Sequence, residues 1–551
     1  MSYFDTQYET MKGYVEDIVF RNVDNGYCVI YVNADDVLQC AVGVFPPIEV
    51  GEYLEMHGNF TVNSKFGEQF NVKECKIIKP TDKEAIMRYL ASGLFAGVGE
   101  VTAKNIVDLY GTATLDVIEN APNKLAAVKG VSLKKAMAIF EAYTVHKEQQ
   151  ATIVYLQGYD ISLNLALKIY KKYGDGTKRI IEKNPYQMVD DVDGVGFITA
   201  DKIAVSMGFD TRSRFRISAA ISYVLQESAN KNGHTYLLRG EVVYEVCRLL
   251  RMDIEEYGYL VNGIILDNVV MGKVVLLGSG DDEKVFLTRM YENELGIAKC
   301  IGALMENARP IDLNFDVDIE QFQKSKGIDL HEAQINAVKN CVKYGVNVIT
   351  GGPGTGKTTI INCIITLLKK QGRKVVLCAP TGRASKRLGE ATGEDAKTIH
   401  RLLDLDFTGG KGHFNYNEDT RLAADVVIVD EVSMCDEYVF YALVRSIKKG
   451  GRLILVGDKD QLPSVGAGNV LADIISCDMI PINYLTRIYR QSDESLIIEN
   501  AHKVNSGVMP TLDNKSKDFF FDSQTDTSVM LSNVINLTVK RLPSFAGITP
   551  K

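Results

Sequence analysis

Long apolar runs are missing from this sequence, and no stretch is long and apolar enough to span a membrane. The first residues lack the basic and apolar segments of a secretory signal, and the ten cysteines never form a CxxC pair. A disulfide framework and a zinc site are therefore not indicated, and we expect a cytoplasmic protein of bacterial type. Fixed-period solenoid repeats and low-complexity segments are not found either.

An excess of positive charge is also missing, because the net charge is −8. This balance argues against a general nucleic-acid coat protein, although it is compatible with a protein that has a local basic groove. The 551 residues, of which 46% are apolar, suffice for several domains. Composition alone leaves the function open.

The pattern of apolar residues changes several times along the chain. Residues 1–80 contain short alternating segments typical of strands, so we expect a small OB-like β-barrel there. Residues 81–215 have a helical pattern, and residues 216–322 mix helices with two expected strands, IILDNVVMG and VVLLGSG, as in a winged-helix-like connecting domain. From residue 323 onward, apolar strands alternate with helices, which predicts a multidomain α/β chain with a parallel sheet covered on both faces.

A strand at residues 346–350 runs directly into a glycine-rich loop, and a helix follows the loop. The loop reads GGPGTGKTT and has the spacing of a P-loop, in which backbone N–H groups surround phosphate oxygens at a helix N-terminus. We expect Lys357 to reach the β- and γ-phosphates of ATP and the Thr358 hydroxyl to ligate Mg²⁺. The expected nucleotide-binding residues of the loop are Gly352, Pro353, Gly354, Thr355, Gly356, Lys357, Thr358 and Thr359.

Two carboxylates end a later apolar strand of the same sheet, VVIVDE at 426–431. We expect Asp430 to hold Mg²⁺ through water, and Glu431 to orient and deprotonate the water that attacks the phosphate. The next strand, RLILVGD, leads to Gln461, which we expect beside the γ-phosphate. Each feature alone is also typical of an ordinary strand end or surface loop, and the P-loop upstream favours the catalytic interpretation.

Seven ordered segments now form a recognisable set. They are GGPGTGKTT (351–359), CAPTGRASKRL (378–388), KTIHRLL (397–403), VVIVDEVSM (426–434), LVGDKDQLPSVGAGNVL (455–471), LTRIYRQ (485–491) and IIENAHKVNSGVMP (497–510). With LHEAQINAVKN (330–340) and two N-terminal segments, YLASGLFAGVGEVTAKNIV and NPYQMVDDVDGVGFITADKIA, they make the chain resemble the RecD/TraA family of superfamily 1 DNA helicases. The resemblance is greatest to the long RecD-like helicases that carry an extra N-terminal region.

This resemblance implies 5′-to-3′ translocation on single-stranded DNA, driven by ATP hydrolysis and coupled to separation of a duplex. It implies a first RecA-like P-loop NTPase motor domain at 323–484 and the incomplete start of a second at 485–551. It also implies that Gln334 contacts the adenine and that Arg490 reaches the γ-phosphate from the second motor domain.

Family members continue beyond the position of Lys551, with the rest of a second motor domain. We therefore expect this chain to bind ATP·Mg²⁺ without unwinding duplex DNA. Residues 485–551 are expected to supply one or two strands and to be poorly ordered or aggregation-prone.

Candidate DNA contacts follow two strands of the expected motor domain. Thr381, Arg383 and Lys386 open a helix, and their hydroxyl and cationic groups suit phosphate contacts. Thr398 and His400 are expected in the same groove, although a solvated helix face gives the same pattern.

An inserted β-hairpin is expected at 406–421, as in the family's pin that splits the duplex. Phe414 or Tyr416 would meet a base pair at the tip of this hairpin. A plain surface loop is equally compatible with this segment.

Glycine turns in the helical region predict a second kind of DNA contact. Gly97 and Gly99 flank a valine before a helix, and Gly194 and Gly196 repeat the arrangement. These turns resemble helix-hairpin-helix elements, whose backbone N–H groups face a phosphate without reading bases, and Lys129-Gly130-Val131 is a third candidate. Tight helix packing is the alternative explanation of each turn.

The expected partners are therefore single-stranded DNA, duplex DNA with a 5′ overhang, and repair or replication proteins, with no membrane. Two other functions stay open. One is a non-hydrolysing, nucleotide-gated DNA-binding module, and the other is an RNA-directed helicase.

Overall fold

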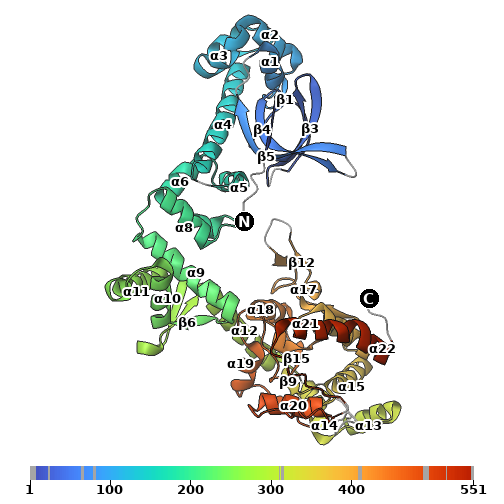
Figure 1. Cartoon of the computed structure of the whole chain (residues 1–551). Coiled ribbons are helices and arrows are strands. Elements are labelled where there is room, and N and C mark those ends of the chain that lie inside the picture. The colour runs from blue at the N-terminus through green and yellow to red at the C-terminus, as the bar shows by residue number, and fades with distance from the viewer. Residues whose placement is uncertain are drawn as a thin grey trace. The chain divides into compact units, whose positions relative to one another are not determined.

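The computed structural model describes residues 8–22, 25–63, 67–78, 82–159, 161–309, 311, 315–407, 412–487, 495–516 and 518–547. The chain forms two compact units, one with Met1–Val224 and Gly240–Met271, the other with Leu225–Arg239 and Gly272–Lys551. Figure 1 follows the elements along the chain, and each unit is considered by itself. Among the described residues, no helix combines the length and the apolarity that a membrane crossing requires.

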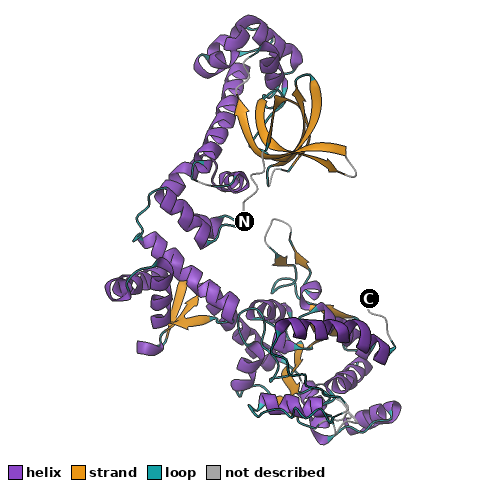
Figure 2. Ribbon diagram, viewed as in Figure 1, coloured by secondary structure: helices purple, strands orange, loops and turns teal. Residues whose placement is uncertain are grey.

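The first unit begins with five strands, which Figure 2 shows as a closed ring of arrows. They are β1 (Glu9–Arg21), β2 (Tyr27–Ala34), β3 (Val37–Val44), β4 (Tyr53–Asn63) and β5 (Gly67–Ile78). Their order around the barrel is β1-β2-β3-β5-β4, and alternate residues such as Cys28, Ile30 and Val32 point into an apolar core. The expected small barrel is confirmed.

Eight α-helices follow the barrel. They are α1 (Lys83–Ala91), α2 (Glu100–Tyr110), α3 (Thr114–Asn120), α4 (Leu133–Gln157), α5 (Leu163–Tyr173), α6 (Thr177–Lys183), α7 (Gln187–Asp191) and α8 (Phe197–Ser206). Short helices joined by tight glycine turns are the arrangement that the sequence predicts for a helix-hairpin-helix region. The apolar side chains of α1 to α4 form one core, whose members include Ile86, Ile106 and Ile139.

The helical region contains a duplication, in which residues 98–120 and 161–183 have the same local structure. Helices α2 and α5 each have 11 residues and are followed by a single 3₁₀ turn and a helix of 7 residues. Each 3₁₀ turn begins at a glycine of nearly identical conformation, Gly111 at φ 59°, ψ −137° and Gly174 at φ 53°, ψ −137°. Thr114 and Thr177, both fully buried, then donate to the carbonyl oxygens of these glycines at 2.7 and 2.6 Å.

A connecting segment then runs from α9 to α12. Its elements are α9 (Arg214–Asn232), β6 (Tyr236–Leu238), α10 (Arg239–Leu250), α11 (Ile254–Val270), β7 (Val274–Leu277), β8 (Lys284–Leu287) and α12 (Thr288–Asn307). From α9 to β8 this is the order of elements in a winged helix, and the three strands form an antiparallel sheet, β6-β8-β7.

The expected strand IILDNVVMG in this segment is wrong, because residues 264–270 are the last turns of α11. Val261, Ile264 and Ile265 are buried at helical spacing, so the β-branched run packs as one face of a helix. The second expected strand is correct over β7, at Val274–Leu277.

Six parallel strands form the sheet of the second unit, in the order β11-β10-β14-β15-β9-β16. They are β9 (Val346–Gly351), β10 (Val375–Ala379), β11 (Ala396–Thr398), β14 (Val426–Val429), β15 (Arg452–Gly457) and β16 (Ile482–Leu485). This order confirms the predicted P-loop NTPase sheet.

Alternate strand residues face opposite layers of helices, so the sheet is buried on both sides. Ile428 and Ile454 pack with α13 (Phe315–Lys326), α14 (Glu332–Lys343), α15 (Lys357–Lys370) and α16 (Gly382–Thr392). Val427 and Leu453 pack with α12, α17 (Ile399–Leu402), α18 (Glu437–Ser446) and α19 (Val470–Ser476).

A short hairpin forms where the inserted pin is expected. Its strands are β12 (Leu405–Asp406) and β13 (His413–Phe414), and the segment 408–411 between them lies outside the described residues. Phe414 is only 5% exposed and belongs to the core of the motor sheet, so it does not meet a base pair. Tyr416 packs against the same core, whereas Phe407 at the other strand is 68% exposed.

In the described parts of the tail of the chain, 495–516 and 518–547, all the regular elements are helices. It contains α20 (Leu496–Asn505), α21 (Thr527–Asn536), a π-helical turn (Leu537–Arg541) and α22 (Leu542–Ala546). The expectation of one or two strands is wrong for these residues, and β16, the last strand, completes the first sheet beside β9. Large apolar side chains of α21, among them Leu531 and Val534, are exposed.

Candidate nucleotide site and nucleic-acid interface

The glycine-rich loop joins β9 to α15 at the carboxyl edge of the motor sheet. Gly354 and Gly356 have φ of 83° and 85°, a region that side-chain-bearing residues rarely adopt, and Gly356 caps α15. Thr355 Oγ1 donates to Gly352 O at 2.9 Å, which closes the loop on itself. The loop residues from Gly352 to Thr359 line a pocket of about 360 Å³, and the remaining lining residues are Arg387, Leu388, Ala391, Asp430, Glu431 and Gln461.

Lys357 lies at the first position of α15, under the loop. Its Nζ donates to Gly351 O and, at 3.1 Å, to Gly352 O. Burial lowers the pKa of Lys357, and the nearby carboxylates of Asp458, Glu431 and Asp430 oppose that change. The ammonium therefore stands as a cation among acidic groups, held by carbonyl oxygens that phosphate oxygens would replace.

Asp430 and Glu431 follow β14 on the opposite side of the pocket. Burial, and then the charge of Glu431, raises the pKa of Asp430 to about 6. Glu431 has a left-handed backbone, with φ 53°, and its Oε2 is buried without a hydrogen-bond partner among the described residues. Two adjacent carboxylates with this strain and this missing partner form a site prepared for a cation and a polar substrate.

The acidic pair fits Mg²⁺ as part of a shared coordination sphere. No group of three or more His, Cys, Asp or Glu side chains in the described chain could hold a metal alone. Mg²⁺ typically takes one or two protein ligands and completes its shell with water and substrate phosphates. Asp430 and the Thr358 hydroxyl, which line the same pocket, are suitable ligands of this kind.

Gln461 lies in the loop after β15 and reaches the same pocket. The loop is tied to the neighbouring strand, because Lys459 N donates to Thr350 Oγ1 at 3.1 Å. Gln461 N donates to the carbonyl of the buried Asp458 at 3.2 Å, which fixes the start of the loop. The glutamine side chain itself is exposed at the mouth of the pocket.

Gln334 lies beside the P-loop rather than among the residues that line the pocket. Its Oε1 accepts from His331 N at 3.0 Å in a capping box of α14, and its Nε2 donates to Thr355 O at 3.1 Å. Both ends of the buried amide therefore bond to protein, and each end keeps one further hydrogen-bonding position. Arg490 lies outside the described residues.

The candidate DNA contacts of the motor domain gather at one end of β10 and β11. Ala379 pairs with Thr398 in the parallel ladder, so the segments after both strands emerge side by side. Thr381 caps α16 and accepts from Ala384 N at 3.3 Å, and Thr398 caps α17 and accepts from Arg401 N at 3.2 Å. Arg383 and Lys386 are exposed on α16, and the half-buried His400 ring lies 5.9 Å from the Phe414 ring.

Arg387 follows the expected DNA contacts Arg383 and Lys386 in the sequence, and the structure places it at the nucleotide pocket. Its side chain is 77% exposed, and its Nη1 lies 4.0 Å from Glu431 Oε1. Arg387 and Ala391 are one turn apart on α16 and both line the pocket.

The helical hairpins share one geometry. Gly97, Gly130 and Gly194 have φ of 76°, 90° and 89°, and a buried valine follows each of them. The next residue, Gly99, Ser132 or Gly196, caps α2, α4 or α8. Three separate turns thus present the start of a helix with the same backbone.

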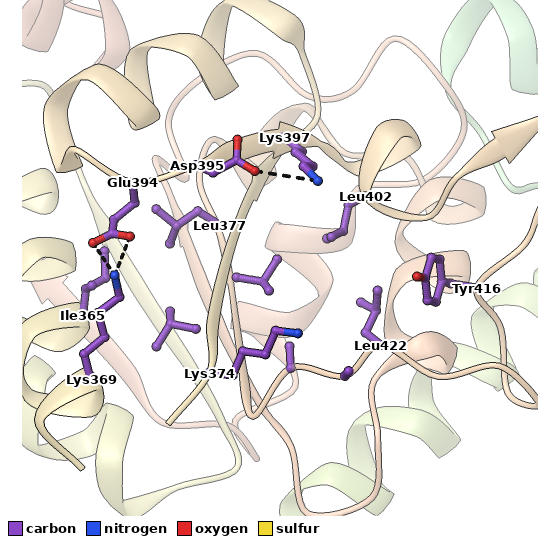
Figure 3. A pocket seen from close by; sticks show the side chains of 14 residues that line it. Ile365, Lys369, Lys374, Leu377, Glu394, Asp395, Lys397, Leu402, Tyr416 and Leu422 are labelled. Carbon is purple, nitrogen blue, oxygen red and sulfur yellow. Dashed lines mark hydrogen bonds and ion pairs between the residues drawn. The ribbon is translucent and has the colours of Figure 1, made fainter. Parts of the chain in front are cut away.

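A further pocket of about 390 Å³ lies between α15 and β11, and Tyr416 is the one predicted nucleotide or DNA residue that lines it. Figure 3 shows Lys369 paired with Glu394 and Lys397 paired with Asp395, and no dashed line reaches Lys374. Most of the charge in this pocket is therefore neutralised within it.

Three family models match separate stretches of the chain. The model described as "ATP-dependent DNA helicase YrrC, OB-fold domain" matches residues 8–80, "ATP-dependent RecD2 DNA helicase HHH domain" matches 145–236, and "AAA domain" matches 334–467. These stretches are the barrel, part of the helical region with α9, and the P-loop portion of the motor sheet.

Two curated proteins and one solved structure are similar to the chain. The ATP-dependent RecD2 DNA helicase of Deinococcus radiodurans is 29% identical over 519 residues, which cover 92% of this chain and 71% of that protein. The RecBCD enzyme subunit RecD of Mycobacterium tuberculosis is 34% identical over 220 residues, 35% of this chain and 36% of that one. A crystal structure of Pif1 helicase from Candida albicans is 25% identical and covers 33% of this chain and 45% of that one. Its TM-score of 0.26 is too low to carry an argument.

Proposed function

Because the chain belongs to the RecD2-type helicases, we propose that it hydrolyses ATP·Mg²⁺ in the P-loop pocket and uses the energy to move 5′ to 3′ along single-stranded DNA. The observation that carries the proposal is the convergence of Lys357, Glu431 and Gln461 on one pocket at the carboxyl edge of the parallel sheet.

Each of these side chains has a separate task in the proposed reaction. Lys357 exchanges its carbonyl partners for phosphate oxygens. Thr358 and Asp430 would hold a magnesium ion, which would neutralise charge on the β- and γ-phosphates. Glu431 takes a proton from water, whose oxygen bonds to the γ-phosphorus as the bond to the bridging oxygen breaks, and ADP leaves. Gln461 orients the γ-phosphate, and Arg490 would supply a guanidinium from the second motor domain.

Single-stranded DNA is proposed to cross the ends of β10 and β11. Thr381, Arg383 and Lys386 offer hydroxyl and cationic groups to phosphates there, and Thr398 and His400 extend the same surface. Gly97, Gly99, Gly194 and Gly196 are proposed as backbone contacts to the phosphates of duplex DNA.

The direct test measures ATP hydrolysis by the 551-residue chain with and without an oligo-dT strand. Stimulation by DNA supports the proposal. Equal rates of hydrolysis with and without DNA, or no hydrolysis at all, contradict it. An oligo-U strand of equal length is the parallel arm, and stronger stimulation by RNA would favour an RNA-directed helicase instead.

Direction is tested by strand displacement from duplexes with a 5′ tail, a 3′ tail or blunt ends. Displacement from the 5′-tailed duplex alone supports 5′-to-3′ movement, and displacement from the 3′-tailed duplex overturns it. The same assay tests the expectation that this chain does not unwind. If hydrolysis is stimulated by DNA and no duplex opens, movement is read from displacement of streptavidin from a biotinylated 3′ end.

The proposed setting is the cytoplasm, with DNA repair or replication proteins as neighbours. All ten cysteines are free thiols in the structure, as a reducing compartment requires.

A further inference from the structure

Arg387 connects the nucleotide pocket to the helix that carries the candidate DNA contacts. Its guanidinium lines the pocket and forms an ion pair with Glu431, the proposed base, at 4.0 Å. The side chain is 77% exposed, so packing does not fix it in this position. A cation with this freedom moves to whichever acidic group attracts it most.

Helix α16 carries cationic groups both at its first turn and at the pocket. Arg383 and Lys386 are exposed beside the Thr381 cap, and Arg387, one turn after Arg383 on the same side of the helix, lines the pocket. The far end of the helix is fixed to the P-loop helix, because Asn362 of α15 donates to Ala391 O at 3.1 Å. Force applied at the first turn of α16 is therefore transmitted along a helix whose other end is held.

The charges of the pocket indicate what Arg387 does before and after nucleotide enters. Asp430, Glu431 and Asp458 surround Lys357, so a second cation at the mouth offsets part of the remaining negative charge. A guanidinium near Glu431 also competes with the attacking water for that carboxylate. Phosphate oxygens are strong partners for arginine, and a bound γ-phosphate offers Arg387 an alternative to Glu431.

We propose that Arg387 couples DNA binding to hydrolysis by holding Glu431 until DNA binds at the first turn of α16. DNA at Thr381 and Arg383 shifts the helix, the guanidinium passes from the carboxylate to the γ-phosphate, and Glu431 becomes available to the attacking water. This inference rests on the proposed DNA-stimulated ATPase and assigns the regulation of that same site to one residue. Arg387 positions Glu431 before DNA binds, and it contacts the γ-phosphate afterwards.

The test compares Arg387→Ala and Arg387→Lys with the native chain, using oligo-dT as the probe. The values of kcat and KM for ATP are measured with and without saturating DNA. We expect Arg387→Ala to raise kcat without DNA about threefold to tenfold and to reduce the DNA stimulation ratio at least about tenfold, with KM changed less than about threefold. Arg387→Lys retains a charge and should recover part of the ratio.

Two controls separate coupling from other roles. Arg373→Ala removes an exposed guanidinium outside the pocket and should leave both rates unchanged. The affinity of Arg387→Ala for oligo-dT, measured by fluorescence anisotropy, should equal that of the native chain, because Arg387 does not face the DNA.

The outcomes distinguish this inference from the proposed function. If the native chain shows no DNA stimulation, the proposed function itself fails. If the native chain is stimulated and Arg387→Ala keeps the same ratio, only the coupling role is overturned. An equal loss of kcat with and without DNA would also overturn it and would make Arg387 a simple phosphate ligand.

Discussion

The nucleotide pocket and the helical hairpins both prepare a place for phosphate, and they do so with opposite chemistry. In the pocket, charged side chains come from the ends of several strands, and burial changes the pKa of Lys357 and Asp430. In the hairpins, glycine or serine at a helix start presents backbone, and the same turn recurs at Gly97, Gly130 and Gly194. A site of unique side chains should fail when one is removed, whereas a site of repeated backbone turns should lose affinity in small steps.

The largest effect is expected from Lys357→Ala. Removal of the ammonium leaves the phosphates facing Asp430, Glu431 and Asp458 without a protein cation inside the loop, so kcat should fall about 10³-fold or more. The melting temperature should change by only about 3 °C, because little packing is lost. Steady-state hydrolysis and a thermal scan are the measurements, and retained turnover would remove the pocket as the ATPase site.

Glu431→Gln should lower kcat about 10²- to 10³-fold while ATP binding persists. The amide keeps the shape of the side chain and cannot accept a proton. Binding of a fluorescent ATP analogue and single-turnover hydrolysis separate the two properties. Normal turnover together with weak nucleotide binding would assign Glu431 to binding instead of proton transfer.

The residues of the nucleotide pocket were predictable from the sequence because each lies close in the chain to the end of an apolar strand. Asp430 follows an apolar strand directly, and Lys357 and Gln461 each follow one after a short loop. Parallel strands bring their carboxyl ends together, so the pocket follows from the order of segments. Gln334 was placed near the nucleotide, yet its bonds to the P-loop and to its own helix depend on tertiary distances. The position of Arg387 at the pocket depends on which side of α16 faces the P-loop, and a linear motif does not contain that information.

Other features were hidden because tertiary packing decides them. Ile264 and Ile265 are β-branched and favour a strand locally, and burial of one helical face overrides that preference. The sequence suggested that Phe414 could meet a base pair. Its side chain is instead buried and packs the hairpin against the core of the motor sheet. The duplication was missed because its halves share only scattered identities, such as Gly111 with Gly174 and Thr114 with Thr177.

A smaller effect is expected from the basic face of α16. Arg383→Ala with Lys386→Ala should reduce oligo-dT affinity about tenfold near 0.1 M salt and lower the slope of log Kd against log salt by about 1 to 1.5. Anisotropy titrations over a salt series give both values. An unchanged slope would place the DNA elsewhere on the motor domain.

The hairpins should respond more weakly still. Gly99 and Gly196 have negative φ, and a Cβ at either position meets no atom within 4 Å, so alanine fits the free protein. Ser132 already occupies the equivalent place in another hairpin. Each alanine should nevertheless obstruct a close phosphate and weaken duplex binding roughly threefold, with the double variant near tenfold. Unaltered duplex affinity in the double variant would mean that these turns only pack helices.

The smallest effect concerns the two halves of the duplication. It tests whether two segments with the same backbone conformation also have the same local stability. Thr114→Val and Thr177→Val each replace a fully buried hydroxyl by a methyl group and leave the glycine carbonyl with only the backbone N–H of the same residue as its donor. Each change should cost about 1–2 kcal/mol of local stability, whereas Thr→Ser at the same positions keeps the bond and should cost less.

Hydrogen exchange of the peptides that contain α3 and α6 measures the two openings separately in the intact chain. If the copies are equivalent, each valine variant lowers the free energy of opening of its own helix by the same amount, within about 0.5 kcal/mol, and leaves that of the other copy unchanged. A loss that spreads from one copy to the other would instead show that the region opens as one cooperative unit, and the small-step behaviour expected of the hairpins would then not hold.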